Sequence, residues 1–492
     1  MASPLSALDR PIAVGGFMAV GKSTVGRLLA RELGRPFADG DAEVERRAGC
    51  SVRALFERDG EAAFRALEET VTRDLLLRDD APVIALGGGA LVAETTRALV
   101  RERAFCAWLD VPFATAWERV GVAGARPLAG DRSSFEQLAA RRAEVYRSSA
   151  DAIVAGDEPA NAMAGALAQH VWTRAGMARL ALEEGAVAIV DPALGLTPDV
   201  PVIALAGGEE AKSPAGLERL WRALSEQELE RGDVIAIAGG GAVTDVGGLA
   251  AATFLRGLPW IAVPSTLVGQ VDAAIGAKTA INVAAKNDVG AFWQPVAVIC
   301  DPLLLDSLPA REWAGGMAEV IKTGLLTGGR LWELVEHWDP GTGDLAARTE
   351  LVQRCAGFKT LVVASDLDER GRRAILNLGH TIGHGIEAVA GYGGLTHGEC
   401  VSIGLVAALR LSEALAGLEP GTAEHVAQLL QRHGLPVSAP GLDPDAVMRA
   451  MRHDKKRTAG THRMVLLEAI GRPVHGVAVG EDVLAPAVRA AT

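Results

Sequence analysis

Short apolar runs alternate with helical patterns through the first 300 residues, and this alternation limits the fold more than any other feature. The runs lie at residues 11–16, 83–89 and 105–110, and again at 187–191, 202–208, 234–241, 260–266 and 296–302. Apolar runs of this length, separated by helical segments, are typical of parallel strands buried on both faces. The sequence therefore predicts an α/β fold with two successive parallel sheets.

The same patterns divide the chain into three parts. An Ala-rich segment at residues 158–174 predicts a helix that closes the first domain, and the short junction at 175–177 predicts a simple tether. After about residue 308, long Ala/Leu/Val helical patterns replace the strand patterns and continue to the C-terminus. We therefore expect a first α/β domain, a second α/β half and an all-helical half, at residues 1–174, 177–308 and 309–492.

The composition excludes several classes of protein. Among 492 residues, 49 basic and 61 acidic side chains give a net charge of −12, which disfavours nucleic acid or an acidic membrane surface as a partner. No apolar stretch reaches the ~18 residues of a spanning helix, and the N-terminus lacks the apolar core of a signal peptide. Five scattered cysteines without CxxC spacing disfavour a disulfide scaffold or a thiolate zinc site. We expect a cytoplasmic protein that binds small molecules.

The segment GFMAVGKST at residues 16–24 fits the phosphate-binding pattern GxxxxGK[ST] between a predicted strand and a predicted helix. Gly16 and Gly21 let backbone N–H groups surround the phosphates at the helix N-terminus, where Thr24 follows the motif serine. Lys22 would neutralise the β- and γ-phosphate oxygens of ATP, and the Ser23 hydroxyl would bind Mg²⁺. Lys22 is also the only lysine in the first 211 residues. The sequence therefore predicts an ATP site.

Four further motifs suggest what receives the phosphate. They are FADGD at residues 37–41, GEAAFRALE at 60–68, GGG at 87–89, and RPL at 126–128, and an arginine stands at position 142. Together with the phosphate-binding motif, this set resembles the shikimate kinases over residues 10–172. Planar guanidinium groups suit a carboxylate substrate, because they donate two parallel hydrogen bonds to it.

The resemblance implies a role for each of these positions in the phosphorylation of shikimate by ATP. Asp41 would hold the substrate hydroxyls and assist proton removal. Arg65 and Arg142 would bind the carboxylate, and Gly88 would approach the ring. Arg126 would cover ATP.

Three histidines lie within eighteen residues in the C-terminal part: His380, His384 and His397. His380 and His384 share a helix face, but a threonine follows His380, so the HExxH motif of metalloproteases is absent. Glu319, in the segment GGMAEVIK, could supply a carboxylate from a neighbouring helix. Two histidines and one glutamate with an open fourth position are typical of a catalytic zinc site.

A run of three glycines at residues 239–241 follows a predicted strand, which is suggestive of a dinucleotide site but weaker than GxGxxG. With this run, the segments GGGAVTD, VPSTLVGQVDAAIGAKTAIN, GGMAEVIKTG, LNLGHTIGHGIEA and HGECVSIG resemble 3-dehydroquinate synthase over roughly residues 185–490. The resemblance implies conversion of 3-deoxy-D-arabino-heptulosonate 7-phosphate to 3-dehydroquinate and phosphate, with NAD⁺ and Zn²⁺ or Co²⁺. It assigns the metal to Glu319, His380 and His397, and places His384 in the substrate pocket.

The resemblance also implies the remaining contacts of this second site. The NAD contacts would be Glu209, Lys212, Gly240, Gly241, Asp245, Ser265 and Thr266. The substrate contacts would be Asp272, Lys278, Asn287, Lys322, Lys359, Arg373, Asn377 and one of Lys455 and Lys456.

Within this set, Lys278, Asn287 and the Lys455–Lys456 pair would hold the substrate phosphate. Lys359 and Arg373 would hold its carboxylate. Asp272, Lys322 and His384 would take part in the chemistry. Arg256 matches an arginine that crosses a dimer interface, which implies a homodimer.

One stretch departs from the pattern of the synthases. Sixteen residues separate Asp191 from Gly208, too few for a complete βαβ crossover. We therefore expect a trimmed first crossover on the adenosine side of the NAD site.

Other functions remain open from the sequence. The second site could belong to another sugar-phosphate cyclase, although Lys359 and Arg373 would then have no substrate carboxylate to bind. It could also belong to a metal-dependent alcohol dehydrogenase, which would release NADH. A catalytically inactive scaffold is disfavoured, because Lys22 and the three metal-binding residues are all present.

Overall fold

The computed structural model divides the chain into two compact units. One unit comprises Met1–Val263 and Gly276–Asp301, and the other comprises Pro264–Ile275 and Pro302–Thr492. The structure describes residues 9–123, 131–284, 286–339, 344–366, 371–391, 394–452, 457–458 and 461–492. None of the helices in these ranges is long and apolar enough to span a bilayer.

The first unit begins with a five-stranded parallel sheet in the order β2-β3-β1-β4-β5. Its strands are β1 (Ile12–Gly15), β2 (Phe37–Asp39), β3 (Val83–Ala85), β4 (Phe105–Asp110) and β5 (Ala152–Ala155). The central β1 is buried along its whole length, as its uninterrupted apolar run predicts. The segment that follows β1 therefore starts at the carboxyl edge of the sheet, where ligands of open α/β sheets bind.

Seven helices connect and cover these strands. They are α1 (Lys22–Leu33), α2 (Gly40–Ala48), α3 (Val52–Leu76), α4 (Glu94–Arg103), α5 (Phe113–Ala123), α6 (Arg132–Ser149) and α7 (Ala160–Leu167). Helix α3 is kinked at Gly60, whose φ of 84° is accessible to glycine without strain.

The prediction of one closing helix over residues 158–174 was wrong in its last part. Helix α7 ends at Leu167, and β6 (Val171–Thr173) follows as a strand that pairs in parallel with β13 (Ala297–Cys300). Its residues Val, Trp and Thr favour extended backbone, and strand pairing outweighs the alanine-rich helical pattern before them. The expectation of a simple tether at this junction was therefore wrong as well.

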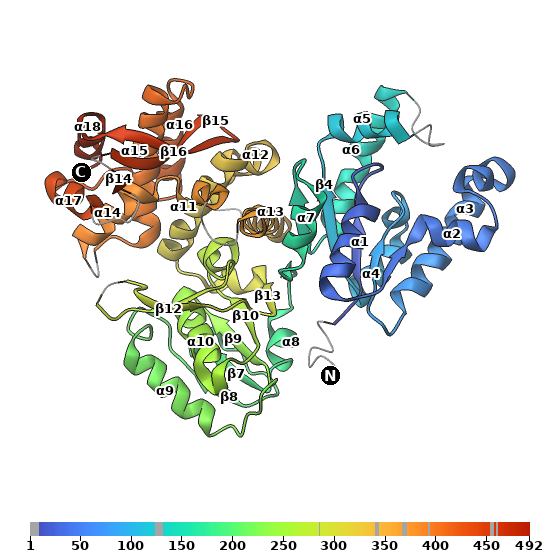
Figure 1. Cartoon of the computed structure of the whole chain (residues 1–492), viewed down its shortest axis with the longest axis horizontal. Coiled ribbons are helices and arrows are strands. Elements are labelled where there is room, and N and C mark those ends of the chain that lie inside the picture. Colours follow the sequence, from blue (N-terminus) through green and yellow to red (C-terminus); the bar gives the residue numbers. More distant parts are fainter. Residues whose placement is uncertain are drawn as a thin grey trace. The chain divides into compact units, whose positions relative to one another are not determined.

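The second sheet of this unit has six strands in the order β6-β13-β10-β9-β7-β8. Its other members are β7 (Val187–Val190), β8 (Val202–Ala204), β9 (Ile235–Gly239) and β10 (Trp260–Pro264). Three helices accompany them: α8 (Ala178–Glu183), α9 (Pro214–Ser225) and α10 (Gly241–Thr253), of which α9 and α10 pack against each other beside the sheet (Figure 1). Only a 3₁₀ turn at Pro192–Leu194 connects the parallel pair β7 and β8, in agreement with the expected trimmed crossover.

A β-hairpin that the sequence patterns did not predict follows in the same unit. Its strands β11 (Lys278–Ile281) and β12 (Val289–Phe292) are antiparallel. Both strands are short, and the exposed positions of β12 hide the alternation that would have marked it.

The second unit is mainly helical. Its helices are α11 (Ala310–Thr327), α12 (Gly329–Glu336), α13 (Leu345–Ser365), α14 (His380–Ala390), α15 (His397–Leu415), α16 (Thr422–Arg432), α17 (Pro444–Arg452) and α18 (Glu481–Ala491). A π-helical turn at Gly269–Ala273 also belongs to this unit.

The prediction of an all-helical half was wrong for residues 457–458 and 461–480. These form an antiparallel sheet of β14 (Arg457–Thr458), β15 (Thr461–Ala469) and β16 (Arg472–Gly480). Gly471, with a φ of 82°, provides the tight turn between β15 and β16, and the buried run at residues 464–467 packs into the helical core. The α/β fold class with parallel sheets is confirmed.

Glycine residues allow α11, α14 and α15 to approach one another closely. A Cβ on Gly398 would lie 2.4 Å from the Cα of Gly315, and a Cβ on Gly404 would lie 2.1 Å from the carbonyl oxygen of Gly379. Contacts this short leave no room for any side chain. The beginnings of α14 and α15 are therefore held against their neighbours by backbone contact.

We expect Gly398→Ala to lower the free energy of unfolding by about 1–3 kcal/mol, because the added methyl must push two helices apart. Gly315→Ala is the matched control at the same helix contact, since its Cβ would meet its nearest neighbour at an ordinary 3.9 Å. The control should be neutral or slightly stabilising, as alanine is the better helix former. Denaturant unfolding of the two variants measures the difference, and equal stabilities would contradict the proposed close contact.

Candidate active sites

The phosphate-binding motif forms a loop between β1 and α1. Gly16 and Gly21 have φ values of 140° and 95°, and a Cβ on Gly16 would lie 2.9 Å from the carbonyl oxygen of Leu109. Lys22 is buried and donates a hydrogen bond of 2.8 Å to the carbonyl oxygen of Phe17. No side chain caps the N-terminus of α1. The loop therefore combines free helical N–H groups with one buried ammonium, which suits phosphate groups.

Ser23 and Thr24 follow Lys22 in the first turn of α1. Ser23 is half-buried and Thr24 is exposed. A hydroxyl at the Ser23 position is the usual Mg²⁺ ligand of such loops. The donor set at this end of the sheet thus fits a nucleoside triphosphate with its Mg²⁺ ion.

Guanidinium groups gather around the glycine run that follows β3. Arg142 of α6 donates a 2.8 Å hydrogen bond to the carbonyl oxygen of Gly88, and the Tyr146 hydroxyl donates one of 2.5 Å to the same oxygen. A Cβ on Gly88 would lie 3.9 Å from Lys22 Nζ, and one on Gly89 would overlap the Arg65 guanidinium. The structure therefore brings Lys22, Gly88, Arg65 and Arg142 together.

Glu68 is a residue of this site that the sequence analysis did not assign. It is buried, and its carboxylate accepts a 2.5 Å hydrogen bond from Arg65. A Cβ on Gly87 would lie 2.2 Å from Glu68 Oε1 and 2.9 Å from Asp41 Oδ1, so both carboxylates converge on this glycine. Burial, together with the negative charge of Asp41, raises the pKa of Glu68 despite Arg65. The spacing of Glu68 three positions after Arg65 on a helix was the available signal.

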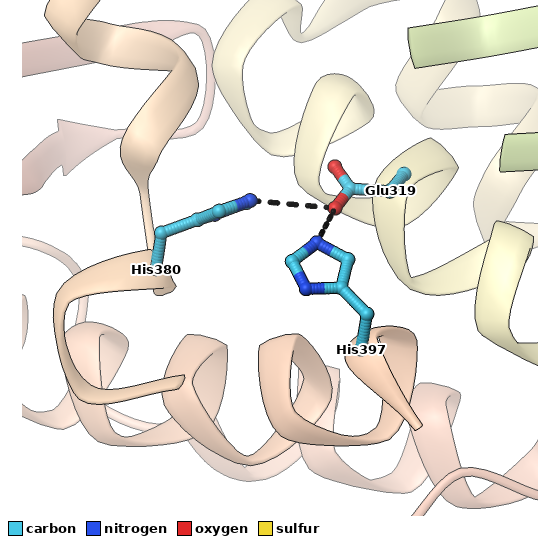
Figure 2. A group of neighbouring side chains, drawn as sticks. All are labelled: Glu319, His380 and His397. Carbon is cyan, nitrogen blue, oxygen red and sulfur yellow. Dashed lines mark ion pairs between the residues drawn. The ribbon is translucent and has the colours of Figure 1, made fainter. Parts of the chain in front are cut away.

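The metal-binding candidates Glu319, His380 and His397 meet in the second unit. Glu319 lies on α11, His380 begins α14, and His397 begins α15, with both imidazoles directed at one carboxylate oxygen (Figure 2). Nε2 of His380 lies 3.4 Å from Glu319 Oε1, and Nε2 of His397 lies 3.5 Å from it. One ligand atom from each residue falls within 4.8 Å of the others.

The Glu319 carboxylate is an unusual buried group. Neither of its oxygens has a hydrogen-bond partner among the described residues, although Lys322 Nζ forms an ion pair of 2.5 Å with Oε2. Burial works to raise the pKa of Glu319, but Lys322 and His380 outweigh it and hold this pKa well below its usual range. An ionised, buried carboxylate beside two imidazoles and no thiolate fits Zn²⁺ or Co²⁺.

Hydrogen bonds at the far sides of the two imidazoles fix their orientation. Nδ1 of His380 lies 3.1 Å from the carbonyl oxygen of Leu378, and Nδ1 of His397 lies 3.3 Å from Glu387 Oε2. Burial works to lower the pKa of His397, but Glu319 and Glu387 raise it to about 9. Such outer contacts orient metal-binding histidines. Glu387 was not assigned from the sequence, although it stands seven positions after His380 on the same helix face.

His384 occupies a different position from the two inner histidines. It is exposed, and it forms a second group of possible ligands with Glu387 and His397, a group that does not include Glu319. The centres of the His384 and His397 rings lie 5.9 Å apart. His384 is therefore beside the inner cluster rather than within it.

A chain of buried charges continues from the cluster. Lys322 lies between Glu319 and Asp272, and their negative charges raise its pKa against the effect of burial. Lys359 Nζ lies 2.5 Å from both the carbonyl oxygen and Oδ1 of Asp272. Burial lowers the pKa of Lys359 even though Asp272 is next to it. Two ammonium groups thus share one aspartate beside the candidate metal ligands.

The other predicted contacts of this unit lie on neighbouring segments. Arg373 is buried, and its backbone N–H donates to Asp366. Asn377 donates to the carbonyl oxygen of Ala374. Ser265 is buried, and the Thr266 hydroxyl accepts a 3.1 Å hydrogen bond from the Gly269 N–H.

Three of the predicted NAD contacts of the first unit, Lys212, Asp245 and Glu209, are held by ion pairs or hydrogen bonds. Lys212 is buried in an ion pair with Asp245, whose pKa is raised by burial. Glu209 accepts a 2.6 Å hydrogen bond from Asn282. Gly240 is the N-cap of α10 and no side chain bonds the helix start there. Gly241 then begins the helix, which leaves its first N–H groups accessible to an anion.

The predicted phosphate and interface contacts lie on the hairpin and on a strained turn. Lys278 and Asn287 are exposed on the hairpin, and Asn287 has a φ of 58°. Leu255 and Arg256 have φ values of 47° and 68°, which are unusual for residues with side chains. Arg126, Lys455 and Lys456 lie outside the described residues.

Comparison with known families agrees with this division of sites. The family model for shikimate kinase matches residues 18–172. The models for the N-terminal and C-terminal parts of 3-dehydroquinate synthase match residues 202–315 and 316–457. The 3-dehydroquinate synthase of Latilactobacillus sakei subsp. sakei (strain 23K) is 42% identical over 275 residues, which are 56% of this chain and 76% of that protein.

Solved structures show the same fold for the second site. A 2-epi-5-epi-valiolone synthase from Streptomyces hygroscopicus subsp. jinggangensis 5008, with NAD⁺ and Zn²⁺ bound, matches at 25% identity with a TM-score of 0.59, over 65% of this chain and 95% of that one. A 2-deoxy-scyllo-inosose synthase complexed with carbaglucose-6-phosphate, NAD⁺ and Co²⁺ matches at 24% identity with a TM-score of 0.58, over 65% of this chain and 96% of that one.

The two sites and these matches define a bifunctional enzyme, a small-molecule kinase fused to a lyase. The chain belongs to the 3-dehydroquinate synthase family, and its N-terminal part is a shikimate kinase domain. It therefore phosphorylates shikimate and forms 3-dehydroquinate, two reactions of the shikimate pathway.

We expect His397→Ala to lose most of its bound metal, whereas His384→Ala keeps about one metal ion per chain. The reason is that His397 Nε2 lies 3.5 Å from Glu319 Oε1, whereas the group of possible ligands that contains His384 does not include Glu319. Glu387→Gln should weaken metal binding by about 10–100-fold, because it removes the charge that orients His397. Elemental analysis and competition with a chelator measure these effects. Equal metal loss in His384→Ala and His397→Ala would contradict the assignment of the metal to His397 rather than to His384.

Proposed function

We propose that Lys22, Ser23 and the glycine loop hold ATP and Mg²⁺ in the kinase domain. The buried ammonium of Lys22 and the uncapped start of α1 support this role. Gly16, Gly21 and Thr24 complete the loop, and Arg126 is assigned to the nucleotide by resemblance alone.

We propose that Arg65 and Arg142 hold the shikimate carboxylate next to this loop. The bond from Arg142 to Gly88 and the bond from Arg65 to Glu68 support this role, because both guanidinium groups are fixed before substrate arrives. Asp41 would accept a proton from the substrate hydroxyl, and the neighbouring Glu68 would hold Arg65 in place. Phosphoryl transfer needs mainly such positioning and charge neutralisation.

We propose that Glu319, His380 and His397 bind the synthase metal, and this cluster is the observation that carries the assignment. The bound structures of the neighbouring cyclases support Zn²⁺ or Co²⁺ together with NAD⁺ for this chain. When bound, NAD⁺ takes and returns a hydride, and the metal polarises the substrate oxygen. Glu209, Lys212, Gly240, Gly241, Asp245, Ser265 and Thr266 would contact NAD⁺.

The residues of the charge chain would bind and orient the substrate. Lys359 and Arg373 would bind its carboxylate, and their positive charges distinguish this site from one for a neutral sugar phosphate. Asp272 would hold Lys359 and Lys322 in position, while Lys322 and His384 would move protons near the substrate oxygens. Asn377 and one of Lys455 and Lys456 are assigned by resemblance.

We propose that the synthase part forms a homodimer through the hairpin. Val283, Val289 and Phe292 expose 58%, 47% and 69% of their surfaces on it. Trp293 directly after it donates a hydrogen bond to Leu258, next to the strained turn that carries Arg256. An exposed apolar surface of this kind is typical of an interface. Lys278 and Asn287, on the same hairpin, would bind the substrate phosphate.

We expect Lys22→Ala to lower shikimate phosphorylation by about 10²–10³-fold, because it removes charge stabilisation worth roughly 3–4 kcal/mol. The same variant should release phosphate from the seven-carbon substrate at the wild-type rate. His397→Ala should do the reverse. Assays of both reactions on both full-length variants test the assignment. Wild-type kinase activity in Lys22→Ala, or phosphate release that survives both chelation and NAD⁺ removal, would contradict it.

A complementation experiment tests the dimer. If Arg256 completes the partner's site, Arg256→Ala and Lys322→Ala chains are each inactive as synthases, yet a mixed dimer contains one site with both native residues. Mixing after mild dissociation should therefore restore synthase activity, and sedimentation should show a dimer. A monomer, or mixtures that stay inactive although mixed dimers form, would refute the proposal.

A further inference from the structure

The segment between the two enzymes is folded into both of them. The backbone N–H of Thr173 in β6 donates a 2.7 Å hydrogen bond to the carbonyl oxygen of Asp151, at the edge of the kinase sheet. On the other side of β6, the N–H of Val298 donates to His170 and the N–H of Arg174 donates to Cys300, both at 3.1 Å. Strand β6 therefore connects the kinase sheet to the synthase sheet through backbone hydrogen bonds.

The Arg174 side chain fastens this strand to the kinase domain. Its guanidinium donates to both oxygens of Asp151 at 2.6 and 2.5 Å, and to the carbonyl oxygens of Arg101 and Ala104 at 2.9 and 2.8 Å. Both members of the ion pair are nearly buried, with 14% and 5% of their side chains exposed. Removing one partner from a buried pair leaves an uncompensated charge, which is strongly destabilising.

Packing and a second carboxylate complete the connection. Trp172 of β6 is buried and stacks on Phe105 of the kinase strand β4, with ring centres 4.8 Å apart and planes 6° apart. On the synthase side, Asp301 accepts hydrogen bonds of 3.0 and 2.9 Å from the N–H groups of Gly176 and Ala178. The chain is therefore attached to the kinase domain at Trp172 and to the synthase part at Gly176 and Ala178.

Without β6, the edge of β13 would present unpaired backbone groups to solvent. Trp172 lies on the strand that pairs with this edge, and its ring stacks on Phe105 of the kinase domain. The compact unit that holds the kinase domain also includes the NAD-binding half, up to Val263 and again over Gly276–Asp301. The kinase–synthase boundary thus falls inside one packed unit.

We infer that the kinase domain is a structural part of the synthase. Through β6 and the Arg174–Asp151 pair, the kinase domain closes the edge of the NAD-binding sheet, so that the two enzymes unfold together. The interaction surface is the β13 edge, and its partner is the kinase domain of the same chain. The fusion consequently has a physical function beyond joint expression.

Ligand protection of the full-length enzyme tests this inference. Shikimate with ADP binds only the kinase site, and binding stabilises whatever unfolds together with that site. In the wild-type chain, these ligands should raise the temperature at which synthase activity is lost by several degrees. In Arg174→Ala, the kinase ligands should protect kinase activity alone, and the backbone amides of Val298 and of position 174 should exchange hydrogen at least tenfold faster than in the wild-type chain.

Arg179→Ala is the matched control, because Arg179 lies only five residues after Arg174. It is an exposed arginine that makes ion pairs with Glu183 and Asp199. It should behave as the wild type does. Arg174→Lys retains the charge and serves if Arg174→Ala does not fold; it should show intermediate protection. Synthase inactivation that ignores kinase ligands in the wild-type chain, or unchanged amide exchange in both Arg174 variants, would overturn the inference.

Discussion

A buried charge costs several kcal/mol unless an opposite charge or well-placed hydrogen bonds compensate it, and each candidate site of this chain is organised by that constraint. Lys22 bonds a carbonyl oxygen in the phosphate loop, Glu68 pairs with Arg65, and Lys212 pairs with Asp245. These groups are held in place by the pairs that make their burial tolerable. The sites are therefore preorganised for charged ligands, and the substrates of both reactions are anions.

Glu319 shows the same constraint at its most demanding. Its carboxylate is wholly buried, is held ionised by Lys322 and the two histidines, and lacks hydrogen bonds of good geometry. The glycine contacts between the helices are what allow three separate elements to converge there, since Gly398 lies directly after His397 and touches the backbone of α11. The glycine contacts that pack these helices therefore also bring the three candidate metal ligands together.

A buried ion pair also stabilises the junction between the two enzymes, where its role is structural. Arg174 and Asp151 form a buried pair with no ligand to bind, and its effect is to fix β6 between two sheets. At residues 191–201 a short 3₁₀ turn, with no helix, connects the parallel strands β7 and β8 of the synthase part. The kinase domain supplies packing at the opposite edge of that sheet, so the two parts are connected by more than their covalent bond.

The sequence alone determined the features that depend on local pattern: the parallel strands from their apolar runs, the phosphate loop from its glycines and lysine, and the histidines as candidates from their spacing. Two family resemblances, carried by contiguous motifs, added the reactions. The tertiary structure decided what depends on contacts between distant segments. Glu68 and Glu387 became part of the sites only through their neighbours in space, and strand pairing turned residues 171–173 and 461–480 from expected helix into sheet. Local propensity differs by only about 1 kcal/mol per residue between the two conformations, so the long-range hydrogen bonds and burial of each segment determined its conformation.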